Sequence, residues 1–341
     1  MLKLEKNIEF SDFSVDQVHP SHLDAMLTLW KSQFTRQLQG LAGLPESWSD
    51  ADDATRAFLR PFTEEGRGCV LLLRGQLVGY LLYDAFEFHG EASAFFPVMA
   101  HAVEPELQLT GYSLLYRTIS GQLVSQGILN HLISYAALDQ KLGQFWYELG
   151  FGLYLVDAYR KLEPIKLIQK ETPITVRRAG LPDLDLLVSL NDQAGRYYGE
   201  APLFLHRDAI PADEIKELLL ADRSAVFLAY QGQNSLGFIN CHAVSESDCI
   251  VLTDPSTAVI EPLGVYLTPE SRGLGAGSCL LSTAVDWARG QGLKQMHVDF
   301  ESANFHANQF WLNYFTPVLH SVKRTLNRDA GKEYIPAGVL S

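Results

Sequence analysis

The sequence predicts an α/β protein with two similar halves, each containing a mixed, mostly antiparallel sheet flanked by helices. The chain has 341 residues, and a chain of this length usually divides into domains of ~100–200 residues. A short segment occurs twice, as GQFWYELGF (143–151) and as NQFWLNYF (308–315). The polar stretch KLEPIKLIQKETP (161–173) lies between the halves. We therefore expect two domains, 1–165 and 174–341.

Each half carries its elements in the same order. Segments 70–83 and 226–242 both read as strand, glycine-containing turn and strand. A helix with apolar residues at helical spacing follows in each half, and it ends at Gly127 or Gly292 before another strand. A closing helix with an aromatic pair completes the pattern. The alternative is two unrelated α/β domains that match by chance.

Composition limits the classes of function. The net charge is -13, from 27 Lys and Arg against 40 Asp and Glu, which would repel a phosphate backbone and favours a cationic or neutral substrate. The ten histidines show no HExxH pattern, and the four cysteines show no CxxC pattern. We expect no metal site, and cysteines that are reduced and mostly buried.

Targeting signals are not evident in the sequence. The start, MLKLEKNIEFSDFS, lacks the apolar run of a secretory signal, and no segment has the ~18 apolar residues of a membrane span. We therefore expect a cytoplasmic protein without a membrane or nucleic-acid partner. The sequence does not indicate an oligomeric state.

The segment LTPESRGLGAGS (267–278) has glycines at alternate positions between a short strand and a helix. Glycines allow close backbone approach and turn N–H groups inward, and a helix N-terminus attracts anions. Gly273, Gly275 and Gly277 form GxGxG, which is neither the dinucleotide pattern GxGxxG nor a Walker loop ending in Gly-Lys-Ser/Thr. The segment predicts a diphosphate site of another kind.

Residues 272–277, RGLGAG, resemble the pyrophosphate loop of the GNAT acyltransferase superfamily, whose pattern is Gln/Arg-x-x-Gly-x-Gly/Ala. Segment 261–269 resembles the fourth strand of that family, and segment 296–315 resembles its fifth strand and closing helix. The resemblance covers about residues 174–324. The first half is similar more faintly, with Ser113 where Gly or Ala is usual. The resemblance of both halves implies tandem GNAT-like domains, of which the first copy is degenerate.

The resemblance implies that acetyl-CoA binds to the second half, with its pantetheine arm between two parallel strands. The strand backbone of Val265 and Leu267 would pair with this arm, and Asn304 and Phe310 would line the far side. The residues expected to hold the pyrophosphate are Arg272, Gly273, Leu274, Gly275, Ala276, Gly277 and Ser278.

Acyl transfer from a thioester to an amine requires a neutral amine, donors for the oxyanion and protonation of the thiolate. Glu261 stands at the inferred start of the fourth strand, where several GNAT enzymes place a general base. A surface carboxylate is the alternative. The usual general-acid tyrosine is replaced by Trp311, whose indole cannot supply a proton. Tyr314, one turn later, is the candidate acid, with core packing as the alternative.

Tyr197 and Tyr198 are expected to form a wall for a cationic or aromatic acceptor, with helix-end packing as the alternative. The implied activity is direct transfer of acetyl from acetyl-CoA to a primary amine of a small molecule or peptide in a ternary complex. A second interpretation keeps the fold without turnover, as a regulatory or structural acyl-CoA-binding protein. Tandem acyltransferases of thiol-cofactor biosynthesis share the same layout.

Overall fold

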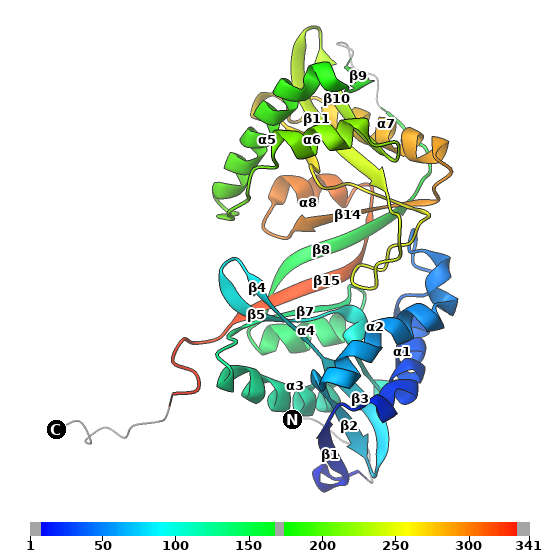
Figure 1. Cartoon of the computed structure of the whole chain (residues 1–341), viewed down its shortest axis with the longest axis vertical. Coiled ribbons are helices and arrows are strands. Elements are labelled where there is room, and N and C mark those ends of the chain that lie inside the picture. Colours follow the sequence, from blue (N-terminus) through cyan, green and yellow to red (C-terminus); the bar gives the residue numbers. More distant parts are fainter. Residues whose placement is uncertain (1–7, 168–173, 333–341) are drawn as a thin grey trace, which may run out of the picture. The chain divides into compact units, whose positions relative to one another are not determined.

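A computed structural model describes residues 8–167 and 174–332 (Figure 1). Its contacts divide the chain into two compact units. Within the described residues, unit 1 comprises 8–39, 49–154 and 319–332, and unit 2 comprises 40–48, 155–167 and 174–318. Each unit therefore includes a segment from the other half of the sequence. The two domains expected from the sequence, 1–165 and 174–341, stay a prediction from the sequence repeat.

Unit 1 contains two sheets with helices packed on them. One sheet has the strand order β1-β2-β3-β6, and the other has the order β4-β5-β7 followed by residues 319–325 of β15. The elements are β1 (Phe13–Gln17), α1 (Leu23–Gln37), α2 (Asp52–Glu65), β2 (Gly68–Leu73), β3 (Gln76–Leu82), β4 (Asp84–Phe88), β5 (Glu91–Phe96), β6 (His101–Val103), α3 (Gln108–Ser125), β7 (Asn130–Ala136), α4 (Gln140–Glu148) and part of β15 (Thr316–Thr325).

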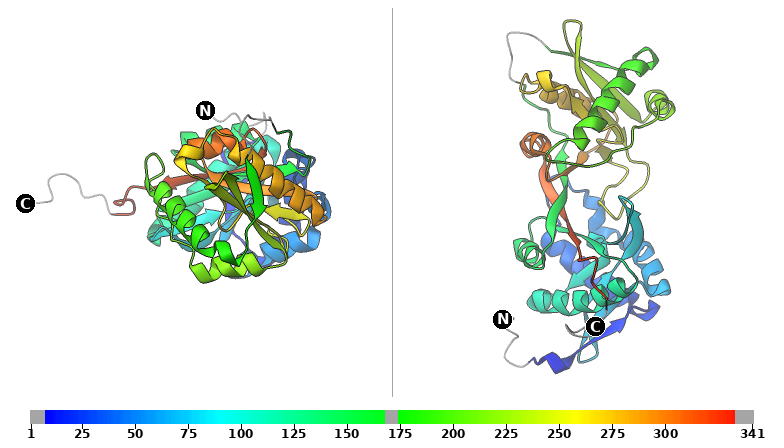
Figure 2. Two further views of the ribbon diagram at one scale, coloured as in Figure 1. Left: turned by 90° about the horizontal axis from the view of Figure 1, so that it is seen from above. Right: turned by 90° about the vertical axis from the view of Figure 1, so that its left-hand side faces the viewer.

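Unit 2 contains one mixed sheet, in the order β8-β14-β12-β11-β10-β9, with β13 also paired to β11. Helices α5 and α6 cover one face and α7 covers the other (Figures 1 and 2). The elements are residues 155–161 of β8 (Gly152–Lys161), β9 (Thr175–Arg178), α5 (Leu184–Gly199), α6 (Ala212–Leu220), β10 (Ser224–Gln231), β11 (Asn234–Ala243), β12 (Thr257–Val259), β13 (Val265–Leu267), α7 (Ala276–Gly290), β14 (Gln295–Glu301) and α8 (Phe305–Trp311). The predicted mixed α/β class is confirmed.

The two units repeat one local design. Hairpins β2–β3 and β10–β11 confirm both predicted hairpins, and each has a register shift that leaves one extra residue in its second strand, Val78 or Leu236. A glycine of the second strand then faces the third strand, with Gly79 opposite Val103 and Gly237 opposite Leu267. A Cβ atom on Gly237 would lie 2.0 Å from the carbonyl oxygen of Tyr266, so only glycine permits this close approach.

The last strand of each sequence half belongs to the other unit. Residues 319–325 pair antiparallel with β7, and Val322 is fully buried in the core of unit 1. Residues 155–161 of β8 pair antiparallel with β14, which places Asp157 opposite Asp299. Each sheet is therefore completed by a strand that is distant in sequence.

Segment 40–48 also belongs to unit 2. The indole N–H of Trp48 donates to the carbonyl oxygen of Leu252 at 2.7 Å, and the Ser47 hydroxyl donates to Asp254 at 2.6 Å. Gly43 has a φ of 89°, and a Cβ atom there would lie 2.7 Å from the backbone of Arg160. Glycine at this position lets the segment pack directly on β8.

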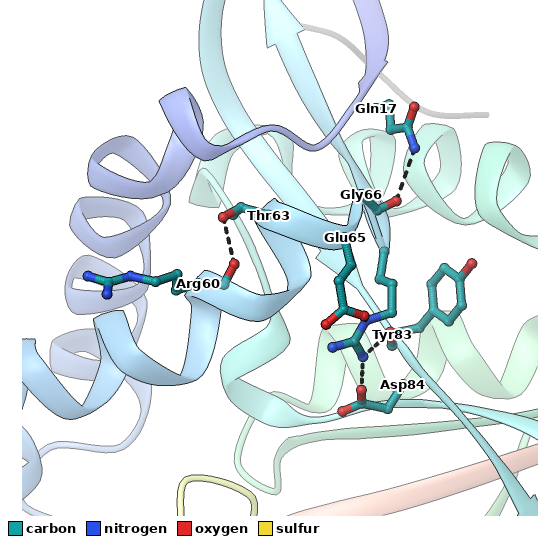
Figure 3. A network of polar contacts seen from close by, with 8 residues as sticks. Gln17, Arg60, Thr63, Glu65, Gly66, Tyr83 and Asp84 are labelled. Carbon is teal, nitrogen blue, oxygen red and sulfur yellow. Dashed lines mark hydrogen bonds and ion pairs between the residues drawn. The ribbon is translucent and has the colours of Figure 1, made fainter.

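A polar network joins the end of α2 to the start of β4 in unit 1 (Figure 3). Arg67 forms ion pairs with Asp84 and with Glu65, at 2.8 Å for the latter. The side-chain amide of Gln17 donates to the carbonyl oxygen of Gly66 at 3.2 Å. Exposed ion pairs stabilise a fold by only ~0–1 kcal/mol, so this network orients the connection between the elements.

The expectations about membrane spans, metal sites and cysteines can be compared with the described residues. Within residues 8–167 and 174–332, no helix is long and apolar enough to cross a membrane. No group of three or more metal-ligating side chains occurs there. All four cysteines are free, and Cys69 and Cys241 are buried, whereas Cys249 and Cys279 are partly exposed.

The last strand of each sequence half belongs to the other unit, and we call this the strand exchange. It predicts that residues 1–165 do not form a stable domain when expressed alone. Without residues 319–325, β7 loses its antiparallel neighbour and the core loses Val322. We expect no cooperative thermal unfolding of this fragment by circular dichroism, and recovery of cooperative unfolding when 174–341 is co-expressed. A fragment that unfolds cooperatively by itself would contradict the prediction.

Candidate functional site

The predicted fourth strand is divided into two pieces. β12 and β13 both pair antiparallel with β11. β12 also pairs in parallel with β14 as far as Val259 and His297, and the amide of Ile260 donates to the His297 carbonyl oxygen at 3.2 Å. The partner of β13 is β11 alone among the described strands. A gap between β13 and β14 therefore opens directly after Val259.

A cleft of about 370 Å³ lies beside β13, between α5, the glycine loop and α8. It brings together many of the residues selected from the sequence. These are Tyr197, Tyr198, Val265, Leu267, Arg272, Gly273, Gly277, Asn304 and Phe310. The other selected loop residues do not line the cleft: Leu274 and Gly275 precede α7, and Ala276 and Ser278 lie in its first turn.

Several lining residues were not predicted from the sequence, and these are Ala194, Tyr266, His306, Ala307, Gln309, Trp311 and Asn313. His306, Gln309 and Phe310 recur at helical spacing on α8, and this spacing could have identified the face that α8 turns to the cleft. Ala194 and Tyr198 are related in the same way on α5. Spacing along each helix was the available signal.

The glycine loop has the backbone that its sequence requires. Gly273 and Gly275 have φ values of 76° and 94°, in the left-handed region that favours glycine. The Cys279 amide donates to the Gly275 carbonyl oxygen at 3.2 Å, which starts α7. Gly277 follows in the first turn, where a Cβ atom would lie 3.0 Å from the Phe310 ring. First-turn N–H groups of a helix have no intrahelical acceptor, so this end of α7 can receive an anion.

Three elements meet at Tyr197. Its hydroxyl donates to Oδ1 of Asn304 at 3.0 Å, and the same oxygen accepts the amide of Ala307 at 3.1 Å. Asn304 is therefore the N-cap of α8. The Arg272 guanidinium lies 4.6 Å from the centre of the Tyr197 ring. These contacts hold α5, the loop and α8 together at one side of the cleft.

The two candidate catalytic residues lie outside the lining of this cleft. Glu261 is in the break between β12 and β13, whereas the sequence pattern predicted it at the start of the strand, which begins at Thr257. Its side chain is 54% exposed and lies 3.8 Å from Nε2 of His242. Tyr314 is half-buried after α8, and its ring packs 5.2 Å from that of Phe310.

A polar face on β14 was only partly anticipated. His297, Asp299 and Glu301 alternate along this strand, so they point to one side of the sheet. His297 is buried, and its Nε2 lies 3.1 Å from Oδ1 of Asp157 on β8. Burial is the largest single influence and lowers the pKa of His297, but the hydrogen bond with Asp157 and the charges of the nearby carboxylates together raise the pKa overall.

Asp299 is unusual for a carboxylate. Desolvation by the surrounding protein, followed by repulsion from Asp157, raises the pKa of Asp299 to about 6, although the side chain reaches solvent. Tyr198, which lines the cleft, is also near this face, because burial and the Glu301 and Asp299 charges raise the pKa of its phenol. The strand face therefore carries acidic side chains whose charges reach Tyr198 in the cleft lining.

The corresponding gap in unit 1 is filled by side chains. His101 matches Val265 in strand register. Burial lowers the pKa of His101 to about 4, so the ring is neutral at pH 7. Its Nε2–H donates across the gap to the Ser134 carbonyl oxygen at 2.8 Å, and Nδ1 accepts the Tyr112 hydroxyl at 2.7 Å. Gln33 donates to the His101 carbonyl oxygen at 3.1 Å.

The glycine loop also has no counterpart in the described residues of unit 1. Gln108, which matches Arg272 in the sequence repeat, is already the first residue of α3. Gly111 lies inside this helix, and a Cβ atom there would be 2.5 Å from Val103. A cavity of about 310 Å³ remains, lined by Arg36, Gln37, Pro105, Gln108, Leu138, Asp139 and Lys141. Among the described residues, no glycine loop lines this cavity with backbone N–H donors.

Ionisation of Asp299 predicts a pH-dependent difference in stability. The folded-state pKa of about 6 exceeds the ordinary value of 3.8, so the stability that a protonated Asp299 contributes at low pH is lost as the pH rises through 6. We expect Asp299→Asn to increase the free energy of unfolding, compared with the unmodified protein, by more at pH 8 than at pH 4. The expected gain is on the order of 1 kcal/mol, because solvent screens a partly exposed group. Equal effects at both pH values in urea titrations would contradict this.

Comparisons with known proteins agree with this geometry. Residues 189–314 match the acetyltransferase (GNAT) family. No curated protein is significantly similar to the chain in sequence. A GCN5-related N-acetyltransferase from Sphaerobacter thermophilus has a TM-score of 0.54 at 12% identity, covering 94% of this chain and 97% of its own.

A second solved structure is the GCN5-related glucosamine N-acetyltransferase region of a fungal multi-domain GH3 β-N-acetylglucosaminidase. It has a TM-score of 0.52 at 14% identity and covers 91% of this chain and 38% of its own. Likeness at these identities concerns the fold. The family match covers residues 189–314, and the solved structures show that the chain has a GNAT-like fold.

Proposed function

We propose that this protein is an N-acetyltransferase that moves an acetyl group from acetyl-CoA to a primary amine of a small molecule or peptide, by direct attack in a ternary complex. The observation that carries the proposal is the gap between β13 and β14, which leads to the glycine loop at the start of α7. The GNAT match over residues 189–314 supports it. Acetyl-CoA would supply the activated acetyl thioester.

The residues around the cleft fit the parts of acetyl-CoA. The edge of β13 offers the backbone groups of Val265 and Leu267, with which an extended amide chain such as pantetheine can pair as an added strand. Backbone donors of the glycine loop and the dipole of α7 favour a diphosphate, with ~0.3–1 kcal/mol per charge from the dipole. Arg272 adds a guanidinium to the same end of the cleft.

The acceptor amine would enter beside the acidic strand face. Tyr197 and Tyr198 line the cleft and can contact a cationic or aromatic acceptor. Glu261, in the break between β12 and β13, is the proposed general base from sequence. Tyr314 is the weaker proposal, because its ring packs on that of Phe310. Release of the thiolate to solvent fits the arrangement better.

We further propose that the first copy serves as a scaffold and binds no CoA. His101 bridges the strand gap to the Ser134 carbonyl oxygen, and Gln33 occupies the carbonyl oxygen of His101. A pantetheine chain would have to displace both hydrogen bonds and the Tyr112 hydroxyl. Buried polar groups left without partners cost ~1–3 kcal/mol each, so the filled gap is the favoured state.

A non-catalytic acyl-CoA-binding role is the second candidate. It is favoured by Trp311, which takes the usual tyrosine position and lines the cleft. Measurement of free-thiol release from acetyl-CoA with a panel of primary amines distinguishes the two. Saturable acetyl-CoA binding without release for any amine would favour the binding role, whereas amine-dependent release with an acetylated product supports the transferase.

The geometry of the glycine loop predicts that Gly273→Val weakens acetyl-CoA binding at least tenfold, which is on the order of 1.4 kcal/mol. Gly273 lines the cleft with a φ of 76°, and no atom lies within 4 Å of the place that a Cβ atom would take there. The matched control is Gly232→Val, because Gly232 has a φ of 61° with equally open space but lies in the β10–β11 turn.

Isothermal titration calorimetry on both variants checks this prediction, with thermal unfolding to compare their backbone strain. We expect Gly232→Val to keep the affinity of the unmodified protein. Equal affinities of the two variants would place the diphosphate away from the loop.

The filled gap in unit 1 predicts a binding stoichiometry of one acetyl-CoA per chain. Only the second copy combines an open strand gap with a glycine loop in the described residues. Calorimetry or native mass spectrometry measures the ratio directly. Two equivalents bound per chain would show that the first copy opens.

A further inference from the structure

Asp299 stands at the point where β12 and β14 part. Val259 and His297 form the last parallel pair, and Asp299 is the next residue of β14 on the same side of the strand. The charges of Asp299 and Glu301 act on the phenol of Tyr198, which lines the cleft. Asp299 therefore lies on β14 just past the last parallel pair, and its charge reaches a tyrosine of the cleft lining.

The carboxylate of Asp299 is available to a ligand. Its cross-strand neighbour Asp157 is engaged by His297 at 3.1 Å, and both of these side chains are buried. Asp299 has no hydrogen bond or ion pair with any residue in the described part of the chain. Its side chain also reaches solvent. No described residue therefore occupies this carboxylate through a hydrogen bond or an ion pair.

Charged groups from each neighbouring strand act on Asp299. Asp157 on β8, Glu301 on β14 and Glu261 in the β12–β13 break are acidic, and His297 is the basic neighbour. Like charges on directly opposed strand residues are destabilising. An ammonium group placed among these carboxylates would relieve the repulsion, so the face selects a cationic group.

We infer that Asp299 is the general base of the proposed acetyl transfer, and that Glu261 instead attracts and orients the acceptor. This inference rests on the proposed function. Glu261 is more than half exposed and has His242 as a partner at 3.8 Å, whereas Asp299 is held on the strand face next to the gap. Two carboxylates in such different environments are suited to different roles.

The transfer step conserves protons and electrons. The carboxylate of Asp299 takes one proton from the acceptor ammonium, and the neutral nitrogen uses its lone pair to form a C–N bond with the thioester carbonyl carbon. The C–S bond then breaks, and the sulfur leaves with its electron pair. The second nitrogen proton goes to the thiolate through solvent, and Asp299 returns its proton to water. The products are an N-acetyl amide and free thiol.

The test compares Asp299→Asn with Glu261→Gln in the full chain, using thiol release with the best amine of the panel. A positioned base contributes about 100-fold or more. We expect Asp299→Asn to lower kcat about 100-fold, with acetyl-CoA affinity within about twofold of the unmodified protein. We expect Glu261→Gln to raise KM for the amine and to lower kcat less than about tenfold.

A pH profile adds a readout that a purely structural role would not move. In the unmodified protein kcat should fall on the acidic side, with an apparent pKa near the value of about 6 for Asp299. Glu301 helps to raise this pKa, so Glu301→Gln should shift the acidic limb to lower pH. Glu301 is partly exposed, which makes this substitution the safer one for folding.

The outcomes separate the two proposals. Absence of thiol release by the unmodified protein with every amine overturns the proposed function and this inference together. Activity in the unmodified protein that Asp299→Asn leaves unchanged overturns the inference alone. Should Asp299→Asn unfold, the Glu301→Gln profile decides, because an acidic limb that does not move also overturns the assignment.

Discussion

The divergence of β13 from β14 is the feature on which the rest of the site depends. It follows from the break between β12 and β13, and Asn240 of β11 supports that break. The Asn240 amide donates to the Gly264 carbonyl oxygen at 2.8 Å, and its side-chain oxygen accepts the Leu263 amide at 3.3 Å. Buried backbone groups need partners, so a fully buried asparagine lets the strand leave β14 while these groups at the break stay paired. The cleft, the glycine loop and the acidic face all follow from this departure.

The two units show that one strand arrangement can be open or filled. Val265 and His101 occupy matching positions, yet only histidine can reach the carbonyl oxygen of the neighbouring strand. The helix that follows this strand also differs between the two units. α3 begins at the residue that matches Arg272, so its first turn takes up the chain that forms the glycine loop in unit 2. Loss of the loop and closure of the gap are therefore consistent with each other.

Local signals in the sequence predicted much of this site. Both hairpins and the glycine loop before α7 follow from short-range patterns. The strand exchange did not, because pairing between residues as distant as Asp157 and Asp299 leaves no periodic signal in either segment. Glu261 was placed at a strand start because one sequence cannot show that the fourth strand begins earlier and bends. The polar side of β14 was visible as alternation, but its partner from β8 was not.

The acidic face is hard to explain by stability alone. Asp157 and Asp299 lie opposite each other on adjacent strands, and like charges in this position oppose folding. The structure compensates Asp157 with buried His297, whose ring also packs 4.8 Å from that of Tyr159. Asp299 has no hydrogen bond or ion pair of this kind in the described residues, and the charge of His297 offsets only part of the rise in its pKa. A carboxylate with a perturbed pKa beside a cleft is typical of functional sites. Local conflicts with folding concentrate at such sites, so the uncompensated member of the pair is the one expected to meet the substrate.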